Sequence, residues 1–118
     1  MVRIEQLAEA AINQDALSLR SLTQDLLRER PQLKDFPRPE AVDFRTLAAA
    51  AALIELFAER LHQEPPSWTR EIGPLPEPIY LVKAAATMKH LRVLCEREAP
   101  EPLRRRGLYA PPNFLESA

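Results

Sequence analysis

The residues of this chain that could bind a metal or act as a thiol nucleophile are few and widely spaced. The histidines are His62 and His90, and the single cysteine is Cys95. Neither histidine has a partner at the spacing of a zinc motif such as HExxH. Cys95 follows His90 by five positions, which places the two on different sides of a helix. We therefore expect no metal and no cofactor.

Nucleophilic catalysis would need Cys95 or a serine close to a base and an orienting acid. Ser18 and Ser21 have no histidine near them in sequence, and no GxSxG elbow occurs. The only glycines, Gly73 and Gly107, do not form a phosphate-binding loop. The carboxylates are scattered over predicted helix faces, where solvated surface is the ordinary interpretation. We predict that the protein is not an enzyme.

The densest charge cluster is the run Arg104, Arg105 and Arg106. These side chains could hold a phosphate or a partner's carboxylates by bidentate contacts. They could instead end a helix, with one arginine folded back onto Glu96, Glu98 or Glu101. We favour this second interpretation because the neighbouring glutamates offset much of the local positive charge.

Composition narrows the class of protein. The 118 residues suit one domain, and we predict a single domain over residues 1–118. The 16 basic and 17 acidic residues give a net charge of −1, which argues against a protein that coats nucleic acid. A lone cysteine favours a reducing compartment. No apolar run approaches the length of a membrane span, and the charged N-terminus does not resemble a signal peptide. We expect a soluble, cytoplasmic protein.

The longest helical pattern is DFRTLAAAAALIELFAERLHQ, residues 43–63. Asp43 is a good capping residue, and two adjacent apolar rows predict a broad buried face. We expect its charged residues, Glu55 included, at the surface. The bulk-free run Ala48–Ala52 would let another helix approach closely.

Three further helices complete a predicted all-α, four-helix bundle-like fold. Apolar spacing predicts them at residues 2–12, 15–30 and about 79–98. Their connections are marked by twelve prolines. The last helix carries a second small patch, Ala84–Ala86, which we expect to face Ala48–Ala52.

Two segments are predicted to be irregular, and side chains that pack into the core should fix each of them. The loop 32–42 has Leu33 and Phe36 as candidates. The proline-rich connection 65–78 suits an extended path, and such a long connection is usually pinned or functional. Trp68 and Ile72 are the candidate anchors there.

The tail, residues 101–118, should contain one helical turn closed by Gly107 and then an irregular aromatic stretch. Tyr109 and Phe114 are large apolar groups that soluble monomers rarely leave exposed. The tail is therefore expected to pack on its own domain or on a neighbouring protein. The candidate partner-binding residues are Trp68, Arg104, Arg105, Arg106, Tyr109 and Phe114.

The first two predicted helices are close enough for a helix-turn-helix. The second would present acidic Asp15, Asp25 and Glu29 among its arginines, a poor surface for a phosphate backbone. DNA binding through these helices stays as the alternative function.

The C-terminal half contains PPSW, GPLPEPIYL and RRRGLYAPPNF. This pattern resembles a group of small bacterial all-helical proteins for which no activity is established. The resemblance implies a small cytoplasmic protein, an accessory or antitoxin-like partner, and supplies no catalytic residue. We accordingly predict a non-catalytic protein-interaction module whose partner is another protein or a second copy. We favour a protein partner over nucleic acid and predict no membrane partner.

Overall fold

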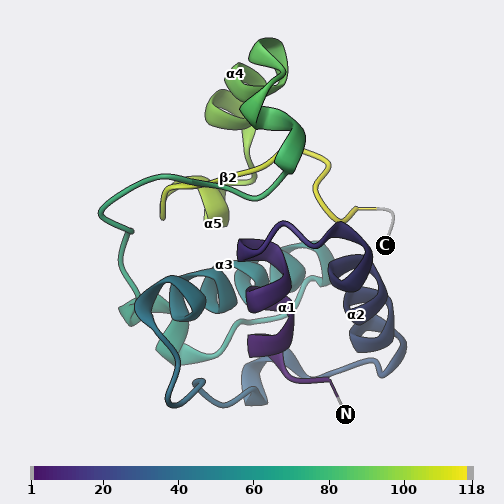
Figure 1. Cartoon of the computed structure of the whole chain (residues 1–118). Coiled ribbons are helices and arrows are strands. Elements are labelled where there is room, and N and C mark those ends of the chain that lie inside the picture. The colour runs from purple at the N-terminus through teal and green to yellow at the C-terminus, as the bar shows by residue number, and fades with distance from the viewer. Residues whose placement is uncertain (1, 117–118) are drawn as a thin grey trace.

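The computed structural model describes residues 2–116 (Figure 1). Five α-helices dominate this part of the chain: α1 Ile4–Ile12, α2 Ala16–Arg28, α3 Phe44–Leu61, α4 Lys89–Glu98 and α5 Glu101–Arg104. Three 3₁₀ turns join them: η1 Leu33–Asp35, η2 Ser67–Glu71 and η3 Lys83–Ala86. Two short strands remain: β1 Ile79–Tyr80 and β2 Leu108–Tyr109. The predicted all-α class is confirmed.

Helix α3 is the buried centre of the molecule, as the sequence predicts. Asp43 caps it by accepting a hydrogen bond from the Thr46 amide at 2.8 Å. Every residue from Thr46 to Ala58 is buried. The helix ends at His62, whose positive φ of 56° gives a left-handed cap. Thirteen consecutive buried positions mean that neighbours cover α3 on all sides.

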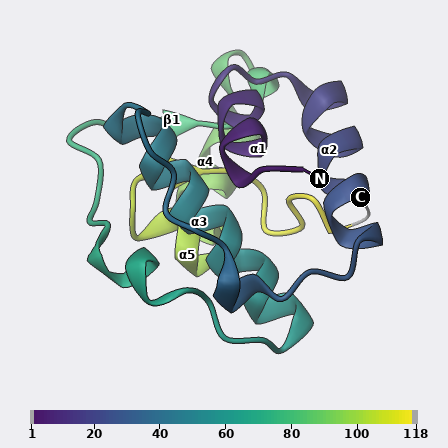
Figure 2. The same ribbon diagram turned by 90° about the horizontal axis from the view of Figure 1, so that it is seen from below.

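Helices α1 and α2 are separated by only three residues, 13–15, and they pack against each other. Asp15 caps α2 through the Ser18 amide, and α1 packs against both α2 and α3. Figure 2 shows α1 lying between the other two helices. Leu7, Ala8 and Ala11 of α1 are fully buried in the same cluster as Ala49 and Ala50 of α3. The small side chains of α3 therefore admit α1.

The prediction of one helix over residues 79–98 is wrong. Ile79–Tyr80 forms a strand, Lys83–Ala86 is a 3₁₀ turn, and helix α4 begins only at Lys89. The expected contact between Ala84–Ala86 and Ala48–Ala52 is also wrong, because Ala84 and Ala86 are exposed while α1 and α5 cover α3. The chain at 79–81 instead donates backbone hydrogen bonds to Gly107 and Tyr109, at 2.8 and 2.9 Å.

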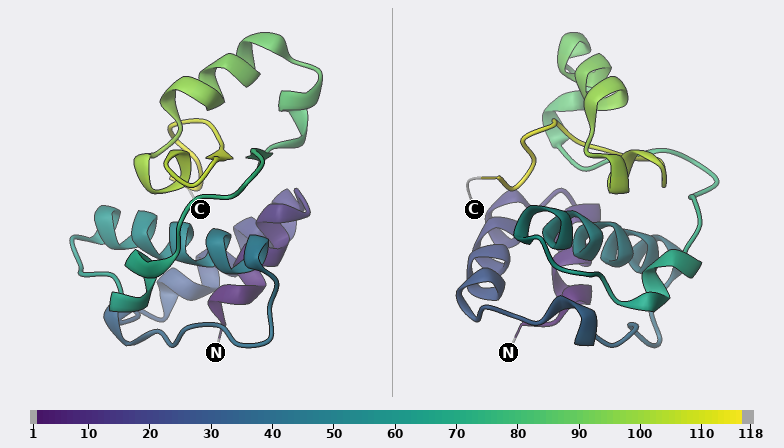
Figure 3. Two further views of the ribbon diagram at one scale, coloured as in Figure 1. Left: turned by 90° about the vertical axis from the view of Figure 1, so that its left-hand side faces the viewer. Right: turned by 180° about the vertical axis from the view of Figure 1, so that it is seen from behind.

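Strands β1 and β2 are parallel, with Ile79 opposite Leu108 and Tyr80 opposite Tyr109. Between the two strands lie residues 81–107, hereafter the excursion. This segment leaves the core after β1 and returns to it before β2. At its end α5 packs against α3, and Gly107 turns the chain into β2 with φ of +79°. Farther out, η3 and α4 (residues 83–98, hereafter the arm) stand apart from α1, α2 and α3 (Figure 3).

The predicted loop anchors are confirmed. Leu33 is fully buried and Phe36 packs against the core. Trp68 also packs there, and its indole Nε1 donates to the Phe36 carbonyl oxygen at 2.8 Å. Ile72 is 6% exposed and contacts the N-terminal part of α3. Within residues 2–116 no helix has both the length and the hydropathy to cross a membrane.

Candidate functional site

The arginine cluster is mostly internal. Arg106 is only 2% exposed, and its guanidinium forms a two-pronged ion pair with Glu55 of α3. The remaining donors reach the carbonyl oxygens of Ile72, Thr69 and Pro102, at 3.2, 2.9 and 3.0 Å. One side chain therefore ties α3, the proline-rich connection and α5 together. Because all of its nitrogens are engaged, Arg106 is not available to a partner in this structure.

Glu55 was expected at the surface, and this expectation is wrong: the residue is 6% exposed. Burial alone raises the pKa of the Glu55 carboxyl, but the hydrogen bonds and positive charge of Arg106 outweigh burial and hold the pKa below its usual range. The carboxylate is therefore ionised at neutral pH. It serves as the counter-ion of a buried cation.

Arg105 and Arg104 lie at the surface beside this pair. Arg105 bridges Glu55 and the exposed Glu101, so one arginine is folded back onto a nearby glutamate as we favoured. Arg104 donates to the Arg97 carbonyl oxygen at 2.7 Å and thereby lies against the end of α4. Of the three arginines, Arg104 makes no ion pair among residues 2–116. It is the one whose charge stays uncompensated.

The aromatic candidates lie largely inside. Phe114 is 8% exposed, and its carbonyl oxygen accepts a hydrogen bond from Arg60 at 2.5 Å. Tyr109 is half-buried in β2, with its ring centroid 5.4 Å from that of Tyr80. Leu108 has no exposed surface. The large side chains of residues 108–116 thus pack on their own chain, and Phe114 belongs to its core cluster, against which Trp68 also packs.

The arm is the least buried part of the helical framework. Among the ten residues of α4, only Cys95 is buried. Leu91 and Leu94 are half-buried, whereas Val93 is 38% exposed and Met88, just before the helix, is 56% exposed. Leu17, Phe44 and Leu61 are exposed elsewhere in residues 2–116, so apolar exposure alone does not single out the arm. What distinguishes the arm is that its exposed apolar side chains lie on a helix that projects from the core. The sequence does not reveal this surface, because its apolar spacing predicts one amphipathic helix over residues 79–98.

The outer face of α4 combines apolar and cationic groups. Lys89, Val93 and Arg97 are four residues apart, so they form one row along the helix, and all three are exposed. His90 borders the row and is exposed as well. Neither Lys89 nor Arg97 forms an ion pair with any carboxylate in residues 2–116. This row, together with Met88 and Arg104, is called the outer face below.

The inner side of the arm is held by polar contacts. Arg92 donates to the carbonyl oxygens of Ala85 and Ala86 at 3.1 and 2.9 Å, which fastens η3 to α4. The Tyr80 hydroxyl donates to the Glu96 carboxylate, and this hydrogen bond raises the pKa of Tyr80 to about 12. Glu96 is therefore turned toward the strands, away from Val93.

Cys95 lies on the inner side of the arm. Burial raises the pKa of its thiol, so the protonated and poorly nucleophilic form prevails at neutral pH. Cys95 packs the arm as a small apolar residue does.

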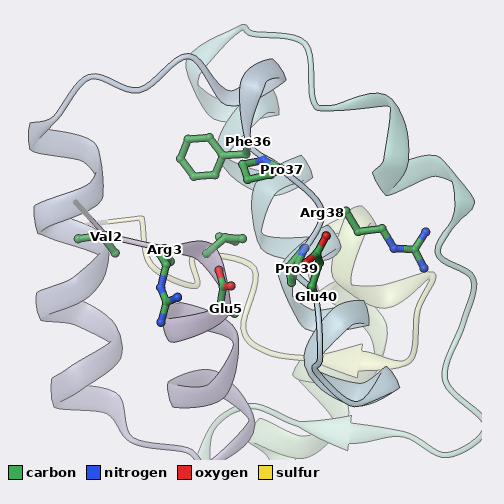
Figure 4. A pocket seen from close by; sticks show the side chains of 9 residues that line it. Val2, Arg3, Glu5, Phe36, Pro37, Arg38, Pro39 and Glu40 are labelled. Atoms are coloured by element: carbon green, nitrogen blue, oxygen red, sulfur yellow. The ribbon is translucent and has the colours of Figure 1, made fainter.

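An open depression of about 550 Å³ lies between the start of α1 and the proline-rich loop (Figure 4). Val2, Ile4 and Phe36 give it apolar walls. Arg38, at its edge, extends away from α1 in the close-up view. Among the described residues that line the depression, none is a buried polar side chain that would act as a fixed donor to orient a specific small ligand.

Metal chemistry finds no support in residues 2–116, where no three His, Cys, Asp or Glu side chains gather to hold an ion. Comparison with known proteins adds no assignment: no family model, no curated protein and no solved structure matches the chain. The outer face of the arm is thus the candidate functional site, and it rests on geometry and charge alone.

Proposed function

We propose that this chain is a non-catalytic protein-interaction module that binds another protein chain through the outer face of the arm. One observation carries the proposal. Helix α4 projects from the core, buries only Cys95, and keeps Met88 and Val93 exposed. A helix that gains so little from its own core is stabilised further when a partner covers it.

The proposal replaces the surface suggested by the sequence. The fold itself is stabilised by the side chains of Trp68, Arg106 and Phe114. They therefore contribute to partner binding only indirectly. Arg104 is the one original candidate that remains on the proposed surface. An accessory or antitoxin-like role, in which a small protein acts by covering part of another, is compatible with such a surface.

Site-specific photocrosslinking tests the proposal. A benzophenone amino acid is placed at His90, on the outer face, and separately at Ser21, an exposed residue of α2. Irradiation of cells that naturally produce the protein should give a discrete protein adduct from position 90 and none from position 21. Adducts that are absent from both positions, or equal at both, would contradict the proposal.

A further inference from the structure

We propose that the outer face of the arm recognises an acidic amphipathic helix of a different protein. This inference rests on the proposed function and names the chemistry of the partner.

Charge is divided between the excursion and the rest of the molecule. The segment between the strands, residues 81–107, has seven basic and three acidic residues, a net charge of +4. The remainder has nine basic and fourteen acidic residues, a net charge of −5, and the two sum to the chain's −1. Arg106 of this segment is buried against Glu55 of the remainder, and the arm itself, residues 83–98, has four basic and two acidic residues, a net charge of +2. The near-neutral total thus conceals a cationic arm, which attracts a surface of the opposite sign.

The carboxylates of the segment do not neutralise the outer face. Of the three, Glu101 forms its ion pair with Arg105, and Glu96 accepts the Tyr80 hydroxyl on the inner side. Glu98 is exposed and forms no ion pair in residues 2–116. Lys89 and Arg97 are left without an acidic partner among residues 2–116, one on each side of Val93. A partner helix that places an aliphatic side chain on Val93 and carboxylates beside it would complement this row.

Two copies of α4 do not complement each other. If they paired antiparallel about Val93, Lys89 of one copy would face Arg97 of the other. If they paired parallel about a two-fold axis, Lys89 would face Lys89 and Arg97 would face Arg97. Either symmetric arrangement brings like charges together, which is destabilising. The row therefore fits a different chain better than a second copy of itself.

The exposed apolar side chains favour a protein over a nucleic acid as the partner. Val93 lies in the same row as the cations, and Met88 is exposed just before the helix. Neither side chain would gain anything from a phosphate backbone. A helix with an apolar row flanked by glutamates can use both kinds of side chain. We therefore assign the surface to an acidic amphipathic helix.

The probe is a labelled synthetic peptide of about 18 residues, long enough to be partly helical, with leucine at helical spacing and glutamate beside it. Fluorescence anisotropy with the full chain at low salt should show binding that weakens as salt rises. The double variant Lys89→Glu/Arg97→Glu should weaken binding at least about tenfold. The matched control Arg20→Glu/Arg45→Glu makes the same charge change outside the arm and should leave binding within about twofold.

Three outcomes would overturn the inference: the glutamate peptide does not bind, it binds no better than a peptide with lysine in place of glutamate, or duplex DNA binds more tightly than either. Circular dichroism of the charge-reversed protein verifies that it is folded. If photocrosslinking gives a partner adduct at His90 and the peptide test gives any of these outcomes, the partner is not an acidic helix. The proposed function is then still supported. Absence of the adduct would reject the proposed function itself.

Discussion

The carboxylate of Glu55 and the guanidinium of Arg106 face each other in the interior, with oxygen–nitrogen distances of 2.6 and 3.1 Å. They are 51 positions apart in sequence and join the middle of α3 to the end of the excursion. Arg106 also binds the carbonyl oxygens of Ile72 and Thr69. The ion pair therefore fixes the base from which the arm projects.

Glu55→Gln should be strongly destabilising, because it leaves a buried guanidinium without its counter-charge. We expect a loss of about 3–5 kcal/mol in the free energy of unfolding, measured in urea. Glu59→Gln on the same helix changes an exposed carboxylate and should alter stability by less than about 0.5 kcal/mol. Equal stability of the two variants would mean that the ion pair does not hold the fold.

The same pair predicts a dependence of stability on pH. The folded-state pKa of Glu55 lies below its unfolded value. The contribution of its ionisation is therefore fully present above the unfolded pKa and is lost as pH falls through the lower folded pKa. The difference in unfolding free energy between the native protein and Glu55→Gln should thus shrink toward zero below about pH 4. A difference that stays constant from pH 7 to this range would contradict the account.

The tail should be essential to the fold. Phe114→Ala removes a ring that is 8% exposed, and we expect a cost of about 3–5 kcal/mol. Asn113→Ala, at the neighbouring exposed position, should cost less than about 0.5 kcal/mol. Thermal melts and sizing of both variants decide the matter. A Phe114→Ala protein as stable as the native one would show that the tail is not part of the core.

Local information in the sequence was enough for α1, α2 and α3. Their 3.6-residue periodicity lies within the segments themselves, Asp43 caps α3 as expected, and Asp15 caps α2 in the same way. The region around Ile79 is different. Its apolar spacing suits a helix, but Tyr80 and Tyr109 pair across 29 positions, and no local pattern encodes that pairing.

The site was harder to predict than the fold. The run Arg104–Arg106 looks uniform in sequence, yet one member is buried and another is exposed beside Arg97. The difference between these arginines arises from Glu55. In the sequence, Glu55 resembles a surface charge among alanines and leucines, and only the packing of α5 on α3 buries it. The outer face of α4 could not be predicted for a related reason. The local sequence around Val93 is the same whether that side of the helix is buried or exposed.

The arm should be dynamically distinct from the core. Helix α4 buries one residue, whereas α3 buries thirteen consecutive ones. Native-state hydrogen exchange should give α4 amides an opening free energy at least about 1.4 kcal/mol below that of α3, a tenfold difference in rate. Equal protection of the two helices would show that the arm opens only with the whole molecule.

The most direct test of the central claim is the photocrosslinking yield from position 90 after removal of the apolar contacts. Met88→Ser/Val93→Ser should leave the unfolding free energy within about 0.5 kcal/mol, because both side chains are exposed. If the outer face binds a partner, the yield should fall at least about tenfold relative to the otherwise unchanged chain. An unchanged yield in an equally stable protein would contradict the claim that this face is the interaction surface.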